Sequence, residues 1–176
     1  MSALSVQPKV SKARTAAKAD SALANVWDSF AQSDPGNYGM FFVMRPVDRA
    51  GVIKSGVPAS VATKISQDMG FPRDRVVRLI GVPPATVNRR LAKNADFSMD
   101  ESERLMGLTK LIGQVEAMVR ESGDPSGFQP AKWFSRWIET PVPALGGRKP
   151  EEFLDTSDGR EAVSTLLAQI QSGAYS

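Results

Sequence analysis

Glycine and proline recur through residues 46–94 at intervals that each fit one short helix, and this punctuation constrains the fold more than any other feature. Within the intervals, apolar residues follow helical spacing, as Val61, Ile65 and Met69 do. Proline suits the first turn of a helix and glycine suits its end, so the pattern predicts a series of short helices. We expect them at residues 46–55, 58–70, 72–80 and 84–94.

The break from Gly81 to Pro84 joins the last two of these helices in the manner of a helix-turn-helix DNA reader. Val87 and Leu91 define the buried face of the final helix, and Arg89 then points away from it. Polar and basic side chains around Arg89 suit phosphates and base edges. The candidate DNA-binding residues are therefore Thr86, Asn88, Arg89, Arg90 and Lys93. A solvent-exposed basic face of an ordinary helical bundle fits the same pattern, but the turn and the charge together favour DNA binding.

The charge is divided unevenly along the chain. Residues 51–95 carry eight basic and two acidic side chains, a net charge of +6, whereas residues 96–176 carry eight basic and thirteen acidic, a net charge of −5. A basic segment followed by an acidic one favours two surfaces with different partners. A solvated helical face explains the charge alone equally well.

The first 45 residues are expected to form an arm and a short helix, and to be partly disordered. Residues 1–20 are small, polar and basic without an apolar stripe, which predicts a mobile arm. Apolar residues at helical spacing predict a short helix at residues 22–31. Residues 38–44 are interpreted as a short strand or an extended connector.

The longest helix is expected at residues 99–121, closing a helix-turn-helix-like domain at residues 46–122. Ser98 and Glu101 have the spacing of a capping box at its start. Its apolar arc is wide enough to serve the core of the domain and a second subunit. We therefore predict a homodimer, although a core alone accounts for most such arcs.

The last helix is expected to open with the cap-like pair Asp158 and Glu161 and to end at Gly173, within a C-terminal domain at residues 123–176. After Glu161 the chain has no charged side chain. A neutral helix of this kind indicates burial on two sides, the second against a partner. Packing on its own domain explains the pattern equally well.

Composition excludes several kinds of chemistry. The chain has no cysteine and no histidine, which excludes disulfides, thiolate metal sites, and Ser-His or Cys-His catalytic arrangements. The acidic run Glu151, Glu152, Asp155 and Asp158 offers oxygen ligands for Mg²⁺, but helix capping explains it more simply. We expect no catalytic residue, metal site or cofactor. The apolar runs stay far short of the about 20 residues that span a membrane, so we expect a cytoplasmic protein without a membrane partner.

The C-terminal part of the chain carries a dense set of residues at fixed spacing: Pro143, Ala144, Leu145, Gly146, Gly147, Arg148, Pro150, Leu154, Asp155, Thr156, Gly159, Val163, Leu166, Leu167, Ile170, Gly173 and Tyr175. In this set the sequence resembles the toxin-binding region of the Xre/MbcA/ParS family of bacterial antitoxins. Residues 55–60 and 81–91 also resemble the helix-turn-helix-like domain of that family. The resemblance covers roughly residues 50–176.

The resemblance implies an all-α fold, with a helix-turn-helix-like domain followed by a small toxin-binding domain. Members of the family neutralise a RES-domain toxin that consumes NAD, and they commonly bind the promoter of their own operon. By this resemblance the toxin-binding residues are Gly146, Gly147, Arg148, Val163, Leu166, Leu167, Ile170, Tyr175 and Ser176. The expected partners are the cognate toxin and promoter DNA, with a homodimer inside a larger complex. The alternative is a stand-alone transcriptional regulator without a toxin.

Overall fold

The computed structural model describes residues 25–34 and 36–173, and within these ranges the chain is built from helices. The described part contains no strand, only two isolated β-bridges, so the all-α prediction is confirmed. The helices are α2 (Val26–Gln32), α3 (Gly39–Val43), α4 (Pro46–Lys54), α5 (Ser60–Met69), α6 (Arg73–Leu79), α7 (Pro84–Ala92), α8 (Met99–Ser122), α9 (Pro130–Trp137), η1 (Pro143–Leu145), η2 (Pro150–Phe153) and α10 (Ser157–Ser172).

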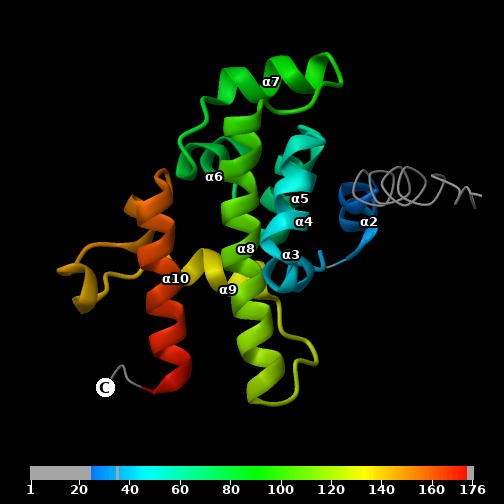
Figure 1. Cartoon of the computed structure of the whole chain (residues 1–176). Coiled ribbons are helices and arrows are strands. Elements are labelled where there is room, and N and C mark those ends of the chain that lie inside the picture. Colours follow the sequence, from blue (N-terminus) through cyan, green and yellow to red (C-terminus); the bar gives the residue numbers. More distant parts are fainter. Residues whose placement is uncertain (1–24, 35, 174–176) are drawn as a thin grey trace, which may run out of the picture.

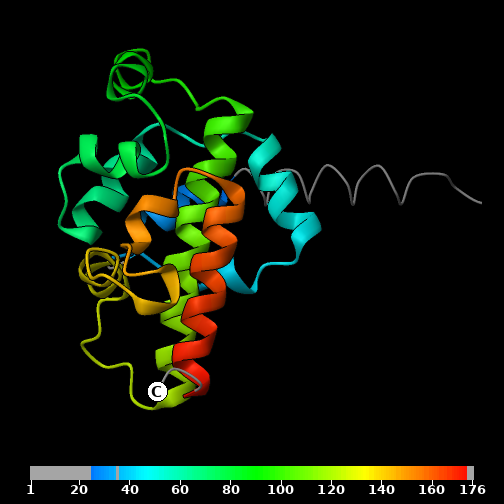
Figure 2. The ribbon, with the colours of Figure 1, turned by 90° about the vertical axis from the view of Figure 1, so that its left-hand side faces the viewer.

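The long helix α8 is the axis of the molecule (Figure 1). Helix α10 runs beside it on one side, and α3 and α4 pack on another (Figures 1 and 2). Helix α7 crosses the end of the molecule where α8 begins, and α9 bridges α5 and α8. The shared helix α8 therefore links the helix-turn-helix part to the C-terminal part.

The start of α8 forms the predicted capping box. The Glu101 backbone N–H donates to Ser98 Oγ at 3.3 Å, and the Ser98 N–H donates to Glu101 Oε2 at 2.7 Å. Leu105, Leu108 and Ile112 are fully buried along the helix. Its wide apolar arc is thus occupied by the core of this chain.

The predicted short helices α4 to α7 are present, and each begins or ends within a few residues of its proline or glycine. Gly70 ends α5 with φ +69°, a left-handed conformation that favours glycine. Pro84 occupies the first turn of α7 as expected. The turn between α6 and α7 passes through Gly81, whose φ is +70°. Local backbone chemistry therefore sets this part of the fold.

The interpretation of residues 38–44 as a strand or an extended connector is wrong, because Gly39–Val43 form the short helix α3. The Gly39 N–H at its start donates to Glu116 Oε2 of α8 at 2.8 Å. Tyr38 and Phe41 are fully buried, and a Cβ at Gly113 of α8 would clash with the Tyr38 carbonyl. Contacts with α8, far away in sequence, therefore select the helix.

The N-terminal arm predicted at residues 1–20 lies outside the described residues. The helix predicted at residues 22–31 is seen as α2, where Trp27 and Phe30 are buried in an aromatic cluster. The Trp27 ring stacks on the Phe41 ring with centroids 4.6 Å apart. Tyr38 also belongs to this cluster, and its hydroxyl donates to Asp68 Oδ2 at 2.7 Å. Burial, reinforced by the Asp68 carboxylate, raises the pKa of the Tyr38 phenol.

Helix α10 begins two residues earlier than the cap-like pair predicts. Its N-cap is Thr156, whose Oγ1 accepts the Gly159 N–H at 3.1 Å, so the prediction that Asp158 caps the helix is wrong. Gly173 ends the helix with φ +69°, as expected. The Gln114 side chain of α8 exchanges two hydrogen bonds with Ser164, at 2.9 and 2.7 Å. These bonds fix the register between α8 and α10.

Candidate DNA-binding and toxin-binding surfaces

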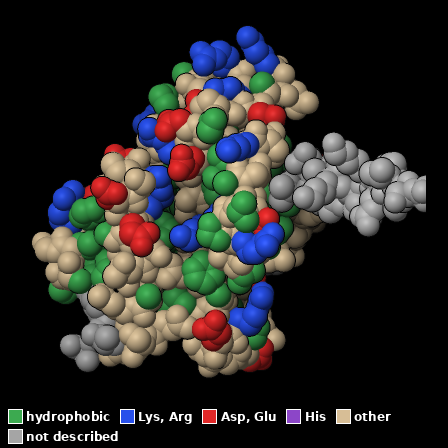
Figure 3. All heavy atoms as spheres, viewed as in Figure 1, with side chains coloured by type: hydrophobic (Ala, Val, Ile, Leu, Met, Phe, Trp, Pro, Cys, Tyr) green, Lys and Arg blue, Asp and Glu red, His purple; other side chains and the backbone are tan. Residues whose placement is uncertain are grey.

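Helix α7 presents two cations to solvent. Arg89 and Lys93 are both exposed, and neither forms an ion pair within the part of the chain that the structure describes. Figure 3 shows Lys and Arg side chains gathered at the end of the molecule where α7 lies. Val87 on the opposite face is fully buried. The helix is therefore anchored by its apolar face and open on its basic one.

The other predicted DNA-binding residues differ in exposure and in the hydrogen bonds that they form within the chain. Asn88 is exposed, and its Oδ1 accepts a hydrogen bond from the Arg73 guanidinium of α6. Thr86 is half-buried, so it faces outward less than the helical angle suggests. No carboxylate in residues 25–34 or 36–173 forms an ion pair with Arg73, so its hydrogen bond to Asn88 leaves its charge uncompensated there. That charge therefore adds to the positive field of this end.

Arg90 is held by the protein itself. Its guanidinium lies 2.7 Å from Glu101 Oε2, and its side chain is 24% exposed. The same group donates to the Asp96 carbonyl at 2.7 Å. Since Glu101 also belongs to the capping box, Arg90 ties the C-terminal half of α7 to the first turn of α8. The structure thus gives Arg90 a positioning contact, and its prediction as a DNA contact stays a prediction.

A tight loop at residues 142–148 projects beyond α10 (Figure 1). The Val142 N–H donates to the Arg148 carbonyl at 3.0 Å, and the Gly147 N–H donates to the Val142 carbonyl at 3.1 Å. Gly146 and Gly147 have φ of +67° and +78°, and both are exposed with no atom near a hypothetical Cβ. The glycines are therefore needed for the backbone of the turn and not for close packing within this chain.

Charges at the base of this loop are paired. Arg148 lies 3.0 Å from Glu152 and stacks on the Phe153 ring, with its Cζ 4.5 Å from the centroid. Glu152 also accepts the Lys149 N–H at 2.9 Å, and this bond followed by the Arg148 contact lowers the pKa of Glu152. Of the four carboxylates in the acidic run, Glu152 is thus engaged at the loop, and the described residues hold no group of three or more metal-ligating side chains.

Helix α10 divides the remaining predicted toxin-binding residues between two environments. Val163 and Leu167 are fully buried in the core and Leu166 is 4% exposed, while Ile170 is half-buried. The opposite face is exposed and uncharged through Ala162, Thr165, Ala168 and Gln169. Tyr175 and Ser176 lie outside the described residues. One face of α10 thus packs on its own core, and the other is open.

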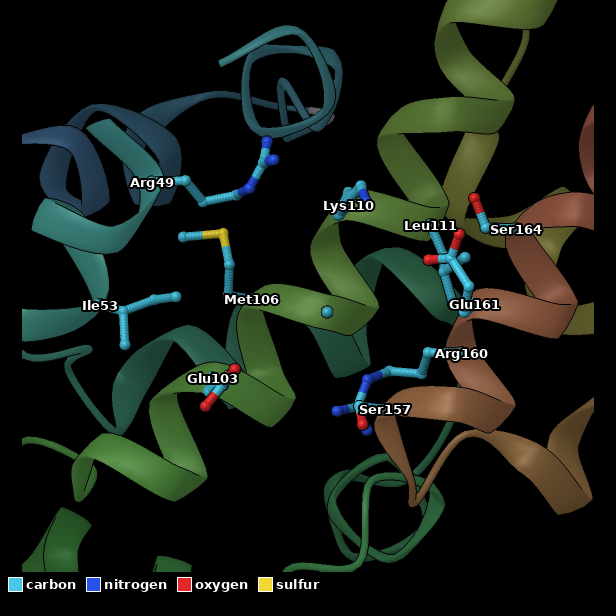
Figure 4. Close-up of a pocket in the computed structure, with 11 residues that line it drawn as sticks. Arg49, Ile53, Glu103, Met106, Lys110, Leu111, Ser157, Arg160, Glu161 and Ser164 are labelled. Atoms are coloured by element: carbon cyan, nitrogen blue, oxygen red, sulfur yellow. The ribbon is translucent and has the colours of Figure 1, made fainter. Parts of the chain in front are cut away.

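A cavity of about 200 Å³ lies between α4, α8 and α10, lined by Arg49, Lys110 and Arg160 (Figure 4). The Arg49 guanidinium donates to two carbonyls near α3, at 2.8 Å each. Arg160 donates to the Leu154 carbonyl at 2.8 Å, and desolvation followed by the nearby charge of Arg104 lowers its pKa. Two of the three cations are therefore committed to main-chain oxygens.

Comparison with known proteins then decides the family. Residues 115–173 match the model of the antitoxin Xre/MbcA/ParS C-terminal toxin-binding domain, and residues 48–109 match that of the antitoxin Xre-like helix-turn-helix domain. The "Prs ADP-ribosylating antitoxin" of Sphingobium sp. (strain YBL2) is 44% identical over 141 residues, 80% of this chain and 89% of that protein. The chain belongs to the Xre/MbcA/ParS antitoxin family.

Two further relatives are named "Antitoxin Xre". The protein of Yersinia enterocolitica is 27% identical over 124 residues, 70% of this chain and 78% of that protein. The protein of Photorhabdus laumondii is 24% identical over 125 residues, 71% of this chain and 79% of that protein. An antitoxin is a binding protein and not an enzyme, and the toxin-binding domain implies a cognate toxin partner. Among the described helices of this antitoxin, none has the length and apolar character needed to cross a membrane.

Sequence reasoning missed the residues that connect the two halves of the antitoxin. Arg75 of α6 contacts Glu139 and Glu151, which lie 64 and 76 positions away in the chain. Glu139 comes three residues before Val142 and Glu151 three residues after Arg148. This symmetric spacing of two glutamates around the loop was the only sequence signal for a contact at its base. It does not identify the cation that would pair with both carboxylates.

Proposed function

We propose that this antitoxin neutralises a RES-domain toxin that consumes NAD, and that it represses its own operon through α7. The toxin is bound by the loop at residues 142–148 together with the uncharged face of α10. The observation that carries the proposal is the open neutral face of α10 beside a rigid, glycine-shaped loop. The name of the Sphingobium relative refers to ADP-ribosylation, a reaction in which the ADP-ribose group comes from NAD.

The DNA part of the proposal rests on charge that has no ionic partner among the described residues. Arg89 and Lys93 are exposed on a helix whose other face is anchored by Val87. Unpaired cations gain free energy from a phosphate backbone through counterion release. Contacts of this kind position a recognition helix, and neighbouring polar groups such as Asn88 then read base edges.

The toxin part is tested by substitutions on the open face of α10. Thr165→Arg and Ala168→Arg add bulk and charge without entering the core, because both positions are exposed. Each variant is co-expressed with the RES-domain toxin, and copurification, cellular NAD and protein ADP-ribosylation are measured. Both variants should lose the toxin and its neutralisation while keeping the wild-type melting temperature.

The matched control is Ala31→Arg, which places the same side chain on the exposed surface of α2. It should bind and neutralise the toxin like the wild type. Wild-type affinity in both α10 variants would refute the proposed interface. Failure of the wild-type protein to bind any RES-domain toxin would refute the proposed partner.

The alternative reading, a stand-alone transcriptional regulator, makes a different prediction. Such a protein would bind promoter DNA without altering the effect of the toxin in cells. Co-expression therefore separates the two functions. Cellular NAD recovers only if the toxin is neutralised, whereas promoter binding can occur without neutralisation.

A further inference from the structure

One arginine of the helix-turn-helix part, Arg75, contacts both chain segments at the base of the loop at residues 142–148. These segments also carry the Arg148–Glu152 pair and a Lys149–Glu151 contact of 3.7 Å. Arg75 Nη2 lies 2.6 Å from Glu139 Oε1 and 3.0 Å from Glu151 Oε2. These two glutamates flank the loop symmetrically, one before it and one after it. One guanidinium nitrogen therefore joins the chain entering the loop to the chain leaving it.

The arginine is itself fixed in place. Its Cζ lies 3.9 Å from the centroid of the Phe71 ring, so the guanidinium rests on an aromatic face. It projects from α6, whose Val76 and Val77 are fully buried. A flexible side chain loses entropy when it forms an ion pair, and prior ordering by the ring reduces that cost. Arg75, with its two glutamate partners, thus forms a staple across the base of the loop, and the side chain of this staple is ordered in advance by the Phe71 ring.

The Arg75 staple supplements the backbone hydrogen bonds that shape the loop at residues 142–148. Five backbone hydrogen bonds lie within residues 142–148, two of which join Val142 to Gly147 and Arg148, and the Glu151 N–H donates to the Ile138 carbonyl at 3.1 Å. No described atom lies within 4 Å of where Cβ atoms of Gly146 and Gly147 would be, so the loop is restrained mainly through its backbone bonds and through the ion pairs at its base. A loop ordered before binding gives up less conformational entropy on meeting its partner.

We infer that Arg75 is a positioning residue for toxin binding: by joining Glu139 to Glu151 it orders the loop at residues 142–148 before the toxin arrives. The inference rests on the proposed function. It also ties the toxin-binding loop to α6, the helix that precedes the recognition helix α7.

The first measurement uses the free antitoxin and needs no toxin. In Arg75→Met, amide hydrogen exchange at Val142, Gly147 and Glu151 should rise about three- to tenfold, the effect of losing two half-exposed ion pairs. Arg75→Lys keeps the charge and should recover part of the protection. Arg78→Met, an exposed arginine on the same helix, should leave exchange unchanged.

The second measurement is toxin affinity. Arg75→Met should weaken binding by about three- to tenfold. Its effect should disappear in a Glu139→Gln/Glu151→Gln background, because the partners of the staple are then already neutral. Wild-type exchange and affinity in Arg75→Met, or an equal loss in Arg78→Met, would overturn the inference.

The two measurements also separate this inference from the proposed function. If the wild type binds no RES-domain toxin but Arg75→Met still loosens the loop, the partner is wrong and the staple stands. If the toxin binds but exchange in the loop is unaffected by Arg75→Met, the partner stands and the staple is wrong.

Discussion

Helix α7 and the loop at residues 142–148 both expose an arginine, but only one of the two arginines is ion-paired. Arg89 of α7 has no ionic partner among the described residues, whereas Arg148 lies 3.0 Å from Glu152 and stacks on Phe153. An unpaired cation gains directly from a polyanion, while a paired one must first lose its partner. Of these two arginines, the one on α7 is therefore open to a polyanion, whereas the one at the loop already serves contacts within the chain.

The largest expected effect lies on the buried face of α10, opposite the proposed toxin-binding face. Leu167→Asp should destabilise the fold by about 3–5 kcal/mol, because it places an unpaired charge in the core. Leu167 is fully buried, so DNA binding and toxin neutralisation should fall together. Thermal unfolding should show a melting temperature lower by roughly 10 °C. Ala168→Asp, one residue later and exposed, should melt like the wild type. An unchanged melting temperature in Leu167→Asp would mean that this side of α10 is not core.

A smaller loss is expected at the one paired arginine of α7. Arg90→Met should destabilise the protein by about 1–3 kcal/mol, since it leaves the half-buried Glu101 without its cation. It should also weaken DNA binding, because α7 loses its tie to α8. The measurements are urea unfolding and promoter affinity. Arg89→Met, the same change at the neighbouring exposed position, should keep wild-type stability. Equal stability of the two variants would show that the clamp is unimportant.

The unpaired cations of α7 should affect binding but hardly stability. Arg89→Ala/Lys93→Ala should change the free energy of unfolding by less than about 0.5 kcal/mol, because both side chains are exposed. Promoter affinity should fall, and its salt dependence should lose at most about two phosphate equivalents. Gel shifts at several salt concentrations measure both quantities. Lys132→Ala/Arg136→Ala, an exposed pair on α9, should leave the salt slope unchanged, and an unchanged slope in the α7 variant would exclude these two as phosphate contacts.

The smallest effect concerns pH at the loop. The Lys149 N–H and the Arg148 guanidinium lower the pKa of Glu152, so the ionised form is favoured in the folded state. A depressed carboxyl pKa stabilises the fold above the ordinary glutamate value of about 4.3, and this contribution is lost as the pH falls through the folded pKa. The Lys149 amide signal in an NMR titration should report that transition. This pH transition should be absent in Glu152→Gln. A transition above pH 5 in the wild type would contradict the assigned contacts.

Helices set by local signals were predictable, and contacts between distant segments were not. The capping box at Ser98 and Glu101 lies within four consecutive residues, so it was read correctly. Helix α3 was misread because its first N–H is satisfied by Glu116, 77 positions away. The second role of Glu101, as the partner of Arg90, likewise depends on how α7 meets α8.

Local patterns were enough to predict the series of short helices, the cap of α8, the exposed cations on α7 and the glycine turn at residues 146–147, because each depends on neighbouring residues and on the angles that proline and glycine allow. The sequence also carried the family in the spacing of its C-terminal residues. Which of the described arginines form ion pairs and which do not depends instead on tertiary packing. An ion pair such as Arg75 with Glu139 forms between segments that packing alone brings together, and no local pattern specifies that distance.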